Sequence, residues 1–183
     1  MHWTLRLATM QDLPVLEGLI RLSVQTLQAS SYSAAQREAA LGTVFGVDRQ
    51  LILDTTYFAA TAGEEIVGCG GWSFRRSIYG SDQAIEGRDK TALDPRHNAA
   101  RIRAFFVHPA WARRGIGRAI LIECEAAILR AGFSRAELVG TLAGEPLYAA
   151  CGYRVVERMT IPLTGGDHLP VVRMARELQP RNS

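Results

Sequence analysis

The sequence predicts an α/β fold, and three observations support this prediction. Short segments rich in β-branched and aromatic residues recur along the whole chain. Two longer segments, residues 13–27 and 119–129, instead carry apolar residues at helical spacing. A strand-type segment at 100–107 precedes the second of these helices, and another strand-type segment at 135–139 follows it. Because a helix connects these two strands, we expect them to be parallel.

The protein begins with a predicted strand and a predicted long helix. Residues 3–8 alternate between apolar and polar side chains, as a strand does. Thr9 is a candidate N-cap with Asp12 three residues further on, which is the spacing of a capping box. Apolar residues then recur at helical spacing up to the polar stretch 30–32: Leu13, Leu16, Leu19, Ile20, Val24 and Leu27.

A second helix is predicted over residues 34–45. Ser33 and Gln36 form another capping-box pair at its start, and Gly46 is expected to end it. Residues 48–54 are compatible with one further helical turn.

A β-hairpin is predicted next. Residues 55–62 are β-rich, and the Gly-Glu pair at 63–64 forms the turn into a strand over 66–74. Because glycine weakens the interior of a strand, glycines there predict a bulge or a close approach of another backbone or a ligand. This strand contains three: Gly68, Gly70 and Gly71.

The remaining segments complete the predicted fold. Residues 75–98 lack apolar periodicity and exceed the length of most loops in compact domains, which predicts a functional role or partial disorder. After the strand at 135–139, a short helix is expected over 145–151. A final antiparallel pair then follows, formed by residues 153–158 and 169–176.

Length and composition indicate one globular domain, over residues 1–178, with a polar tail over 179–183. The protein has 183 residues, of which 48% are hydrophobic and 21% charged, as in an ordinary globular protein. The net charge of +3 does not indicate a nucleic-acid-binding protein. Three widely spaced cysteines, no leader pattern and no long apolar run predict a cytoplasmic protein that does not enter the membrane. The four histidines have no ligand spacing, so no metal site is expected.

The turn over residues 112–119 carries the main functional signal. Its sequence, Ala-Arg-Arg-Gly-Ile-Gly-Arg-Ala, lies between the strand at 100–107 and the long helix. Glycine allows a tight turn and a close approach of the backbone to a ligand. The N-terminus of a helix presents N–H groups and the positive end of its dipole, and the arginines add charge. The turn therefore predicts a site for a phosphorylated ligand that is held mainly by backbone groups.

Two other phosphate-binding loops do not fit this turn. No Lys follows Gly117, as a kinase-type phosphate loop requires. Ile120 occupies the place of the third small residue of a dinucleotide-binding loop. A plain strand-to-helix connection and nucleic-acid binding through the arginines are the remaining alternatives.

Two motifs resemble those of the GNAT (Gcn5-related N-acetyltransferase) superfamily. The acyl-CoA pyrophosphate loop of that family, Gln/Arg-x-x-Gly-x-Gly/Ala, falls on residues 112–117, with Ala112 in its first position. The second motif, Asn-x-x-Ala-x-x-x-Tyr-x-x-x-Gly-Phe/Tyr, falls on residues 141–153. There Thr141 takes the place of Asn and Gly144 that of Ala, while the Tyr-x-x-x-Gly-Tyr core matches.

The resemblance implies a mixed, mostly antiparallel sheet of about seven strands flanked by helices, with strands four and five parallel at its centre. It also implies transfer of an acetyl group from acetyl-CoA to a primary amine of a small molecule, peptide or protein, by direct attack in a ternary complex. Tyr148 matches the tyrosine that protonates the departing CoA thiolate. The implied acetyl-CoA contacts are backbone groups of Phe106 and Val107 for the pantetheine arm and, for the pyrophosphate, Arg113, Arg114, Gly115, Ile116, Gly117, Arg118 and Ala119.

The chemistry of acyl transfer agrees with this assignment. A lysine-like amine with a pKa of ~10.4 is mostly protonated at neutral pH, so it must lose a proton before it attacks a thioester. The developing oxyanion needs an N–H donor, which a strand edge near Val107 offers. The leaving thiolate needs an acid, and the phenol of Tyr148 is one.

The sequence does not select the general base or the acceptor pocket. The strand at 100–107 lacks the Glu that some family members carry there, and four carboxylates remain in the long loop: Asp82, Glu86, Asp89 and Asp94. Strict alternation places Arg101 and Arg103 on one strand face with Phe105, where one of them is available to an acidic group of the acceptor. Aromatic candidates for the acceptor wall are Tyr32, Trp72 and Tyr79.

A second function stays open at this point. A non-catalytic acyl-CoA sensor or interaction module would keep the same fold, and the missing strand carboxylate favours it, whereas Tyr148 favours an enzyme. Tyr148 as a plain core aromatic and Cys151 as a structural thiol are the simpler interpretations of those two residues. Relatives in the superfamily are often dimers, so a homodimer is also open.

Overall fold

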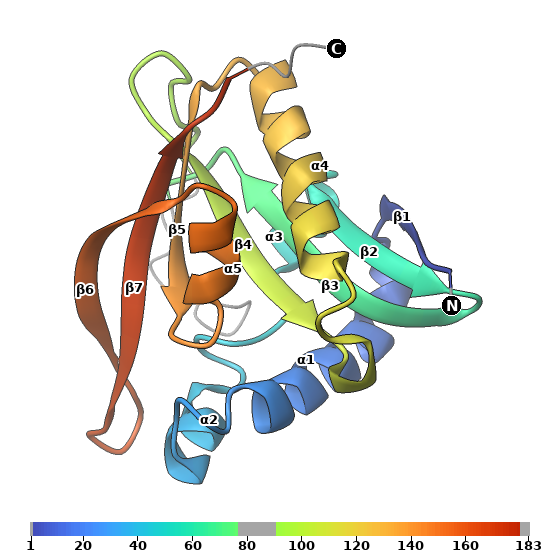
Figure 1. The fold of residues 1–183 in the computed structure, drawn as a ribbon, viewed down its shortest axis with the longest axis vertical. Coiled ribbons are helices and arrows are strands. Elements are labelled where there is room, and N and C mark those ends of the chain that lie inside the picture. The colour runs from blue at the N-terminus through green and yellow to red at the C-terminus, as the bar shows by residue number, and fades with distance from the viewer. Residues whose placement is uncertain (1, 77–90, 180–183) are drawn as a thin grey trace.

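A computed structural model describes residues 2–76 and 91–179. These residues form one seven-stranded sheet in the order β1-β2-β3-β4-β5-β7-β6 (Figure 1). Neighbouring strands are antiparallel except β4 and β5, which are parallel, so the predicted mixed α/β sheet is confirmed. The strands are β1 (Thr4–Leu7), β2 (Tyr57–Ala62), β3 (Glu65–Ser73), β4 (Ala100–Val107), β5 (Arg135–Thr141), β6 (Arg154–Pro162) and β7 (His168–Glu177).

Helices cover both faces of this sheet. The α-helices are α1 (Leu13–Leu27), α2 (Ala34–Ala40), α3 (Arg49–Leu53), α4 (Ile116–Arg130) and α5 (Glu145–Ala150). On one face, Leu16 and Ile20 of α1 belong to an apolar layer that includes Phe106 of β4. On the other face, Ile120 and Cys124 of α4 belong to a second layer. The sheet is therefore buried between two layers, as its largely buried central strands require.

The first helix starts as the capping residues predict, with one difference. Thr9 and Asp12 form the expected capping box, but they enclose a 3₁₀ turn (Met10–Asp12) that leads directly into α1. Asp12 also pairs with Arg6 of β1 at 2.8 Å, which ties the first strand to the start of the helix. The polar residues at the two ends of this turn thus fix where the polypeptide leaves the sheet.

The second helix is shorter than predicted. Its capping box of Ser33 and Gln36 is present, but α2 ends at Ala40 rather than at residue 45. Leu41 is extended, with φ −63° and ψ 134°, and forms a β-bridge with Phe45. The spacing of apolar residues did not predict that α2 ends at Ala40, because a β-bridge between Leu41 and Phe45 replaces the helix there. The further helical turn proposed for residues 48–54 is α3.

The pairing of β3 with β4 contains a β-bulge, as the glycines of β3 predict. Gly71 is opposite Arg103 and Cys69 is opposite Phe106, so Gly70 alone faces two residues of β4. One of them, Ala104, has a φ of 55°. The bulge shifts the alternation of β4, because Phe106 then faces the layer of α1 while Phe105 faces that of α4.

Strands β4 and β5 separate soon after they begin. Their parallel register includes only Ala100 with Ala136 and Arg101 with Glu137. β5 pairs along its whole length with β7 on its other side. Among the described strands, none therefore pairs with the C-terminal half of β4 on the side of β5, and the backbone groups on that side are available to a ligand.

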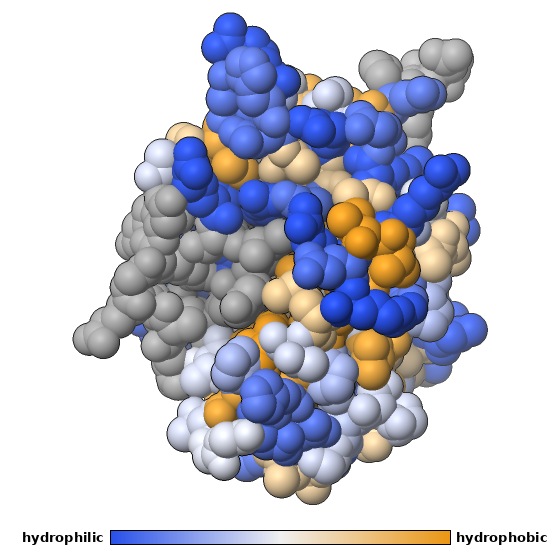
Figure 2. Space-filling model, turned by 90° about the vertical axis from the view of Figure 1, so that its left-hand side faces the viewer, coloured by the Kyte–Doolittle hydropathy of each residue, from blue (hydrophilic) through white to orange (hydrophobic). Residues whose placement is uncertain are grey.

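One edge of the sheet is β6, which pairs only with β7 among the described strands. Figure 2 views the molecule from the side that carries this edge in Figure 1, and hydrophilic and apolar areas alternate on it. Two valines of β6, Val155 and Val156, are among the exposed large apolar residues. Within residues 2–76 and 91–179, no helix has the length and apolar character needed to cross a membrane.

Candidate active site

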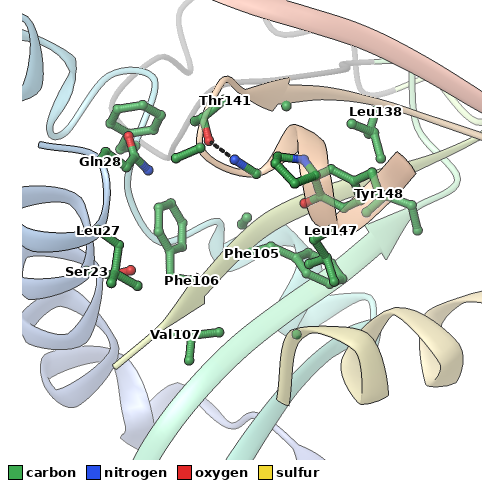
Figure 3. A pocket seen from close by; sticks show the side chains of 18 of the residues that line it. Ser23, Leu27, Gln28, Phe105, Phe106, Val107, Leu138, Thr141, Leu147 and Tyr148 are labelled. Atoms are coloured by element: carbon green, nitrogen blue, oxygen red, sulfur yellow. Dashed lines mark hydrogen bonds between the residues drawn. The ribbon is translucent and has the colours of Figure 1, made fainter. Parts of the chain in front are cut away.

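A pocket of about 650 Å³ opens where β4 and β5 separate (Figure 3). One side is the C-terminal end of α1, the floor is the second half of β4, and the opposite side is α5. The turn between β4 and α4 forms a further wall. The pocket thus connects the glycine-rich turn to the second motif region, residues 141–153.

The backbone of β4 offers polar groups to this pocket. His108 N–H donates to Val67 C=O of β3 at 2.9 Å. Because backbone groups of a strand point to alternate sides, those of Phe106 also face β3, while those of Val107 face the pocket. Phe106 lines the pocket with its ring (Figure 3).

The 112–119 turn leaves N–H groups outside the helical ladder at the start of α4. Arg113 and Gly115 both have left-handed φ values, 63° and 83°, and Gly115 is the N-cap of α4. Ala119 N–H donates to Gly115 C=O at 2.9 Å, so it is the first N–H of the regular helical ladder. The N–H groups of residues 116–118 precede that ladder. Together with the helix dipole they form an anion-binding geometry.

The side chains of this turn divide into two groups. Arg113, Gly115, Ile116, Gly117 and Arg118 line the pocket, whereas Arg114 and Ala119 do not. The guanidinium of Arg114 instead lies 5.2 Å from the centre of the Trp111 ring. Of the three arginines predicted here, two therefore add positive charge at the mouth of the pocket.

Tyr148 is buried at the far side of the same pocket. Its side chain lines the pocket, and its ring packs edge-on against Phe105 of β4 and Tyr153, both at 6.0 Å between ring centres. Burial, with smaller effects of Cys124 and Cys151, raises the pKa of Tyr148 well above its usual value. The phenol therefore holds its proton at neutral pH, which is the state that an acid requires.

The start of α5 is held by the residue that replaces Asn in the second motif. Thr141 Oγ1 accepts a hydrogen bond from Gly144 N–H at 3.1 Å, and this bond is drawn in Figure 3. The Thr141 hydroxyl thus pairs with a backbone N–H group at the start of α5, the helix that carries Tyr148. Cys151 follows Tyr148 by one helical turn and is half-buried outside the pocket lining.

Two aromatic residues predicted for the acceptor wall lie elsewhere. Tyr32 O–H donates to Pro170 C=O at 2.7 Å and accepts from Leu142 N–H at 3.0 Å, so it joins two segments of the fold. Trp72 packs against Phe74 and Phe133 in the layer under α4. Neither lines the pocket, and Tyr79 lies outside the described residues.

The two strand arginines do not share a face with Phe105, contrary to the prediction. Arg103 Nη2 lies 3.0 Å from Asp48 Oδ2, and the two side chains are 4% and 1% exposed. Arg101 pairs with Glu137 of β5. The bulge after Arg103 turns Phe105 to the opposite face, a change that strict alternation cannot foresee.

None of the described pocket-lining residues is a carboxylate or a histidine. Asp94 hydrogen-bonds Arg96 and His97 in its own loop and is not part of the lining. Asp82, Glu86 and Asp89 lie outside the described residues. His108 accepts from Ala110 N–H and caps the turn after β4. Among the residues described, no group of side chains could hold a metal ion.

Sequence reasoning missed the apolar wall at the end of α1. Gln28 lines the pocket there, together with neighbours from four separate segments that no local motif connects: Leu27, Val44, Phe45, Ile161 and Val171. Helical periodicity placed Leu27 in α1, but it carried no signal for the pocket. These residues meet only in the folded protein.

Comparisons with known proteins identify the family and the fold. The family model of the acetyltransferase (GNAT) domain matches residues 54–155. A search of curated protein sequences finds no significant match. Among solved structures, a GCN5-related N-acetyltransferase from Rhodopseudomonas palustris has 19% sequence identity and a TM-score of 0.72, and the match covers 97% of each of the two proteins.

Two further structures contain a ligand of the CoA type. The PaiA N-acetyltransferase of Thermoplasma acidophilum, in complex with coenzyme A, has 16% identity and a TM-score of 0.65, and the match covers 97% of this protein and 99% of that one. YncA of Salmonella typhimurium, with its cofactor acetyl-CoA, has 16% identity and a TM-score of 0.64, with 100% and 98% covered. At these identities the likeness is one of fold. With the domain match, it shows that the protein belongs to the GNAT acetyltransferase family.

Proposed function

We propose that this protein transfers an acetyl group from acetyl-CoA to a primary amine of a small molecule, peptide or protein. The observation that carries the proposal is the anion-binding turn at the mouth of a pocket that ends at a buried phenol. Two structures of the same fold were crystallised with coenzyme A or acetyl-CoA, which supports the choice of co-substrate.

In this proposal the diphosphate of CoA binds the N–H groups of the 112–119 turn. Arg113 and Arg118 add charge at the mouth of the pocket. The pantetheine arm continues along the free edge of β4, where the backbone groups of Val107 face it and the ring of Phe106 contacts it. The thioester then lies at the point where β4 and β5 separate.

The amine attacks the thioester directly within a complex of both substrates. Holding the two reactants together supplies much of the acceleration in such a reaction. A strand N–H stabilises the developing oxyanion, and Tyr148 protonates the departing thiolate. The described lining contains no carboxylate or histidine, so the amine loses its proton to solvent or to a group outside this lining.

The same observation favours one alternative, a non-catalytic acyl-CoA sensor with this fold. The test is an assay of CoA release from acetyl-CoA with a panel of primary amines, in which the N-acetyl product is identified by mass spectrometry. The proposed enzyme forms product with at least one amine. Tight binding of acetyl-CoA with no product from any amine in the panel would favour the sensor.

A further inference from the structure

The pocket contains a buried amide whose oxygen has no partner among the described residues. Gln28 is 6% exposed, and no described residue hydrogen-bonds its Oε1. Its backbone carbonyl accepts from Ser31 and Tyr32 N–H, so the turn after α1 is complete without the side chain. Unpaired buried polar atoms are rare in folded proteins because each one costs stability. The burial of this amide therefore does not stabilise the fold, and a role in binding a ligand is the alternative.

Gln28 and Tyr148 lie on opposite sides of the pocket. Figure 3 shows the Gln28 amide extending from the end of α1 towards the side of Thr141, with Phe106 below it, while Tyr148 lies across the pocket on α5. In the proposed reaction the thioester meets the amine near Tyr148. A group that contacts Gln28 therefore belongs to the far end of the acceptor and not to its reacting nitrogen.

The wall near Gln28 is mostly apolar, with the hydroxyls of Ser23 and Thr141 as further polar groups of the lining. Leu27, Val44, Phe45 and Phe106 contribute hydrocarbon or aromatic surface. Of the described lining residues, none carries a negative charge, and the positive charge of Arg103 is paired with Asp48. A second ammonium group on the acceptor would have no carboxylate to pair with among these residues. An apolar body would instead be buried against the apolar side chains of the wall.

We propose that the acceptor is a primary amine with an apolar body and a distal O–H or N–H group, and that Gln28 Oε1 accepts a hydrogen bond from that group. Gln28 is then a specificity-determining residue. The inference rests on the proposed function for the identity of the reacting end, but it makes a separate statement about binding.

The test compares three amines by calorimetry with the full-length protein, without CoA and at saturating CoA. Tyramine has an apolar body and a distal hydroxyl, 2-phenylethylamine lacks the hydroxyl, and 1,4-diaminobutane has a second ammonium in place of the ring. We expect tyramine to bind about fivefold or more tightly than 2-phenylethylamine, and diaminobutane to bind least. In Gln28→Leu and Gln28→Met, tyramine and 2-phenylethylamine should bind equally within about twofold.

Controls separate this role from a structural one. Both Gln28 variants should unfold at the same temperature as the wild type or higher, because they remove an unpaired buried atom. Gln11→Leu makes the same change at an exposed site outside the pocket and should leave the tyramine preference intact. The inference is overturned if the preference survives in both Gln28 variants, if wild type shows none, or if diaminobutane binds best. Binding as expected without acetyl transfer would contradict only the proposed function.

Discussion

Gly70 of β3 makes room for Phe105 of β4. A Cβ at position 70 would lie 2.6 Å from Cδ2 of the Phe105 ring, well inside contact distance. That ring in turn packs against Tyr148 at 6.0 Å. Gly70 therefore contacts Tyr148 indirectly, through the ring of Phe105. A larger side chain at position 70 should displace that ring and change the packing of Tyr148.

Gly70→Ala should destabilise the protein. The added methyl group must displace the Phe105 ring or separate β3 from β4, and overpacking of this kind costs about 1–3 kcal/mol. Urea unfolding measures this loss. Gly18→Ala is the matched control, since a Cβ at Gly18 of α1 meets nothing within 4 Å. That variant should be as stable as wild type or more so, because alanine favours helix. Equal stability of the two variants would contradict the packing described here.

Tyr148→Phe should reduce kcat by about 100-fold or more, because the leaving thiolate loses its acid. The affinity for CoA should stay within about twofold, since the N–H groups of the turn are unchanged. Tyr153→Phe removes another buried phenol that lies outside the pocket lining, and its kcat should change little. Comparable losses in both variants would show that packing, and not proton donation, explains the effect.

The pH dependence of kcat offers a separate check on Tyr148. Burial raises the pKa of this phenol above its usual value of 10.0, so the acid stays protonated throughout the alkaline range used for assays. The wild-type kcat with a saturating amine should therefore show no decrease up to about pH 10. A descending limb centred near pH 10 or below that disappears in Tyr148→Phe would mean that the pKa of the phenol is not raised.

Asp12→Asn should make the protein less stable at neutral pH by about 1 kcal/mol, because it removes the pair with Arg6 and half of a capping box. Hydrogen bonds, from Arg6 above all, lower the pKa of Asp12 from 3.8 to about 2. A lowered pKa stabilises the folded state above the unfolded-state value, so this contribution is lost as the pH falls from about 4 to about 2. Urea midpoints over that interval should fall more steeply in wild type than in the variant.

The elements that depend on local chemistry were predicted well. The strand at 100–107 and the capping boxes at Thr9 and Ser33 were found where the sequence placed them. The α4 helix begins three residues before the predicted start, at Ile116, because the helix includes the second half of the 112–119 turn. Glycine in the turn is compatible with helix once the N-cap is set by Gly115.

Features that depend on contacts between distant segments were not predicted. Whether Phe105 shares a face of β4 with Arg103 depends on the bulge opposite Gly70, which only the pairing of β3 with β4 reveals. The wall around Gln28 is assembled from α1, the 44–46 segment and strands β6 and β7. Periodicity describes each element alone, so it cannot report a pocket that several elements form together.

The central claim is that N–H groups at the start of α4 bind the diphosphate of CoA. Calorimetry of CoA with wild type and with Arg118→Glu tests it most directly, because a carboxylate there competes for the same N–H groups while remaining favourable for the helix. The account predicts clear binding to wild type and at least about tenfold weaker binding to the variant. No heat with wild type, or equal affinity in both proteins, would contradict it.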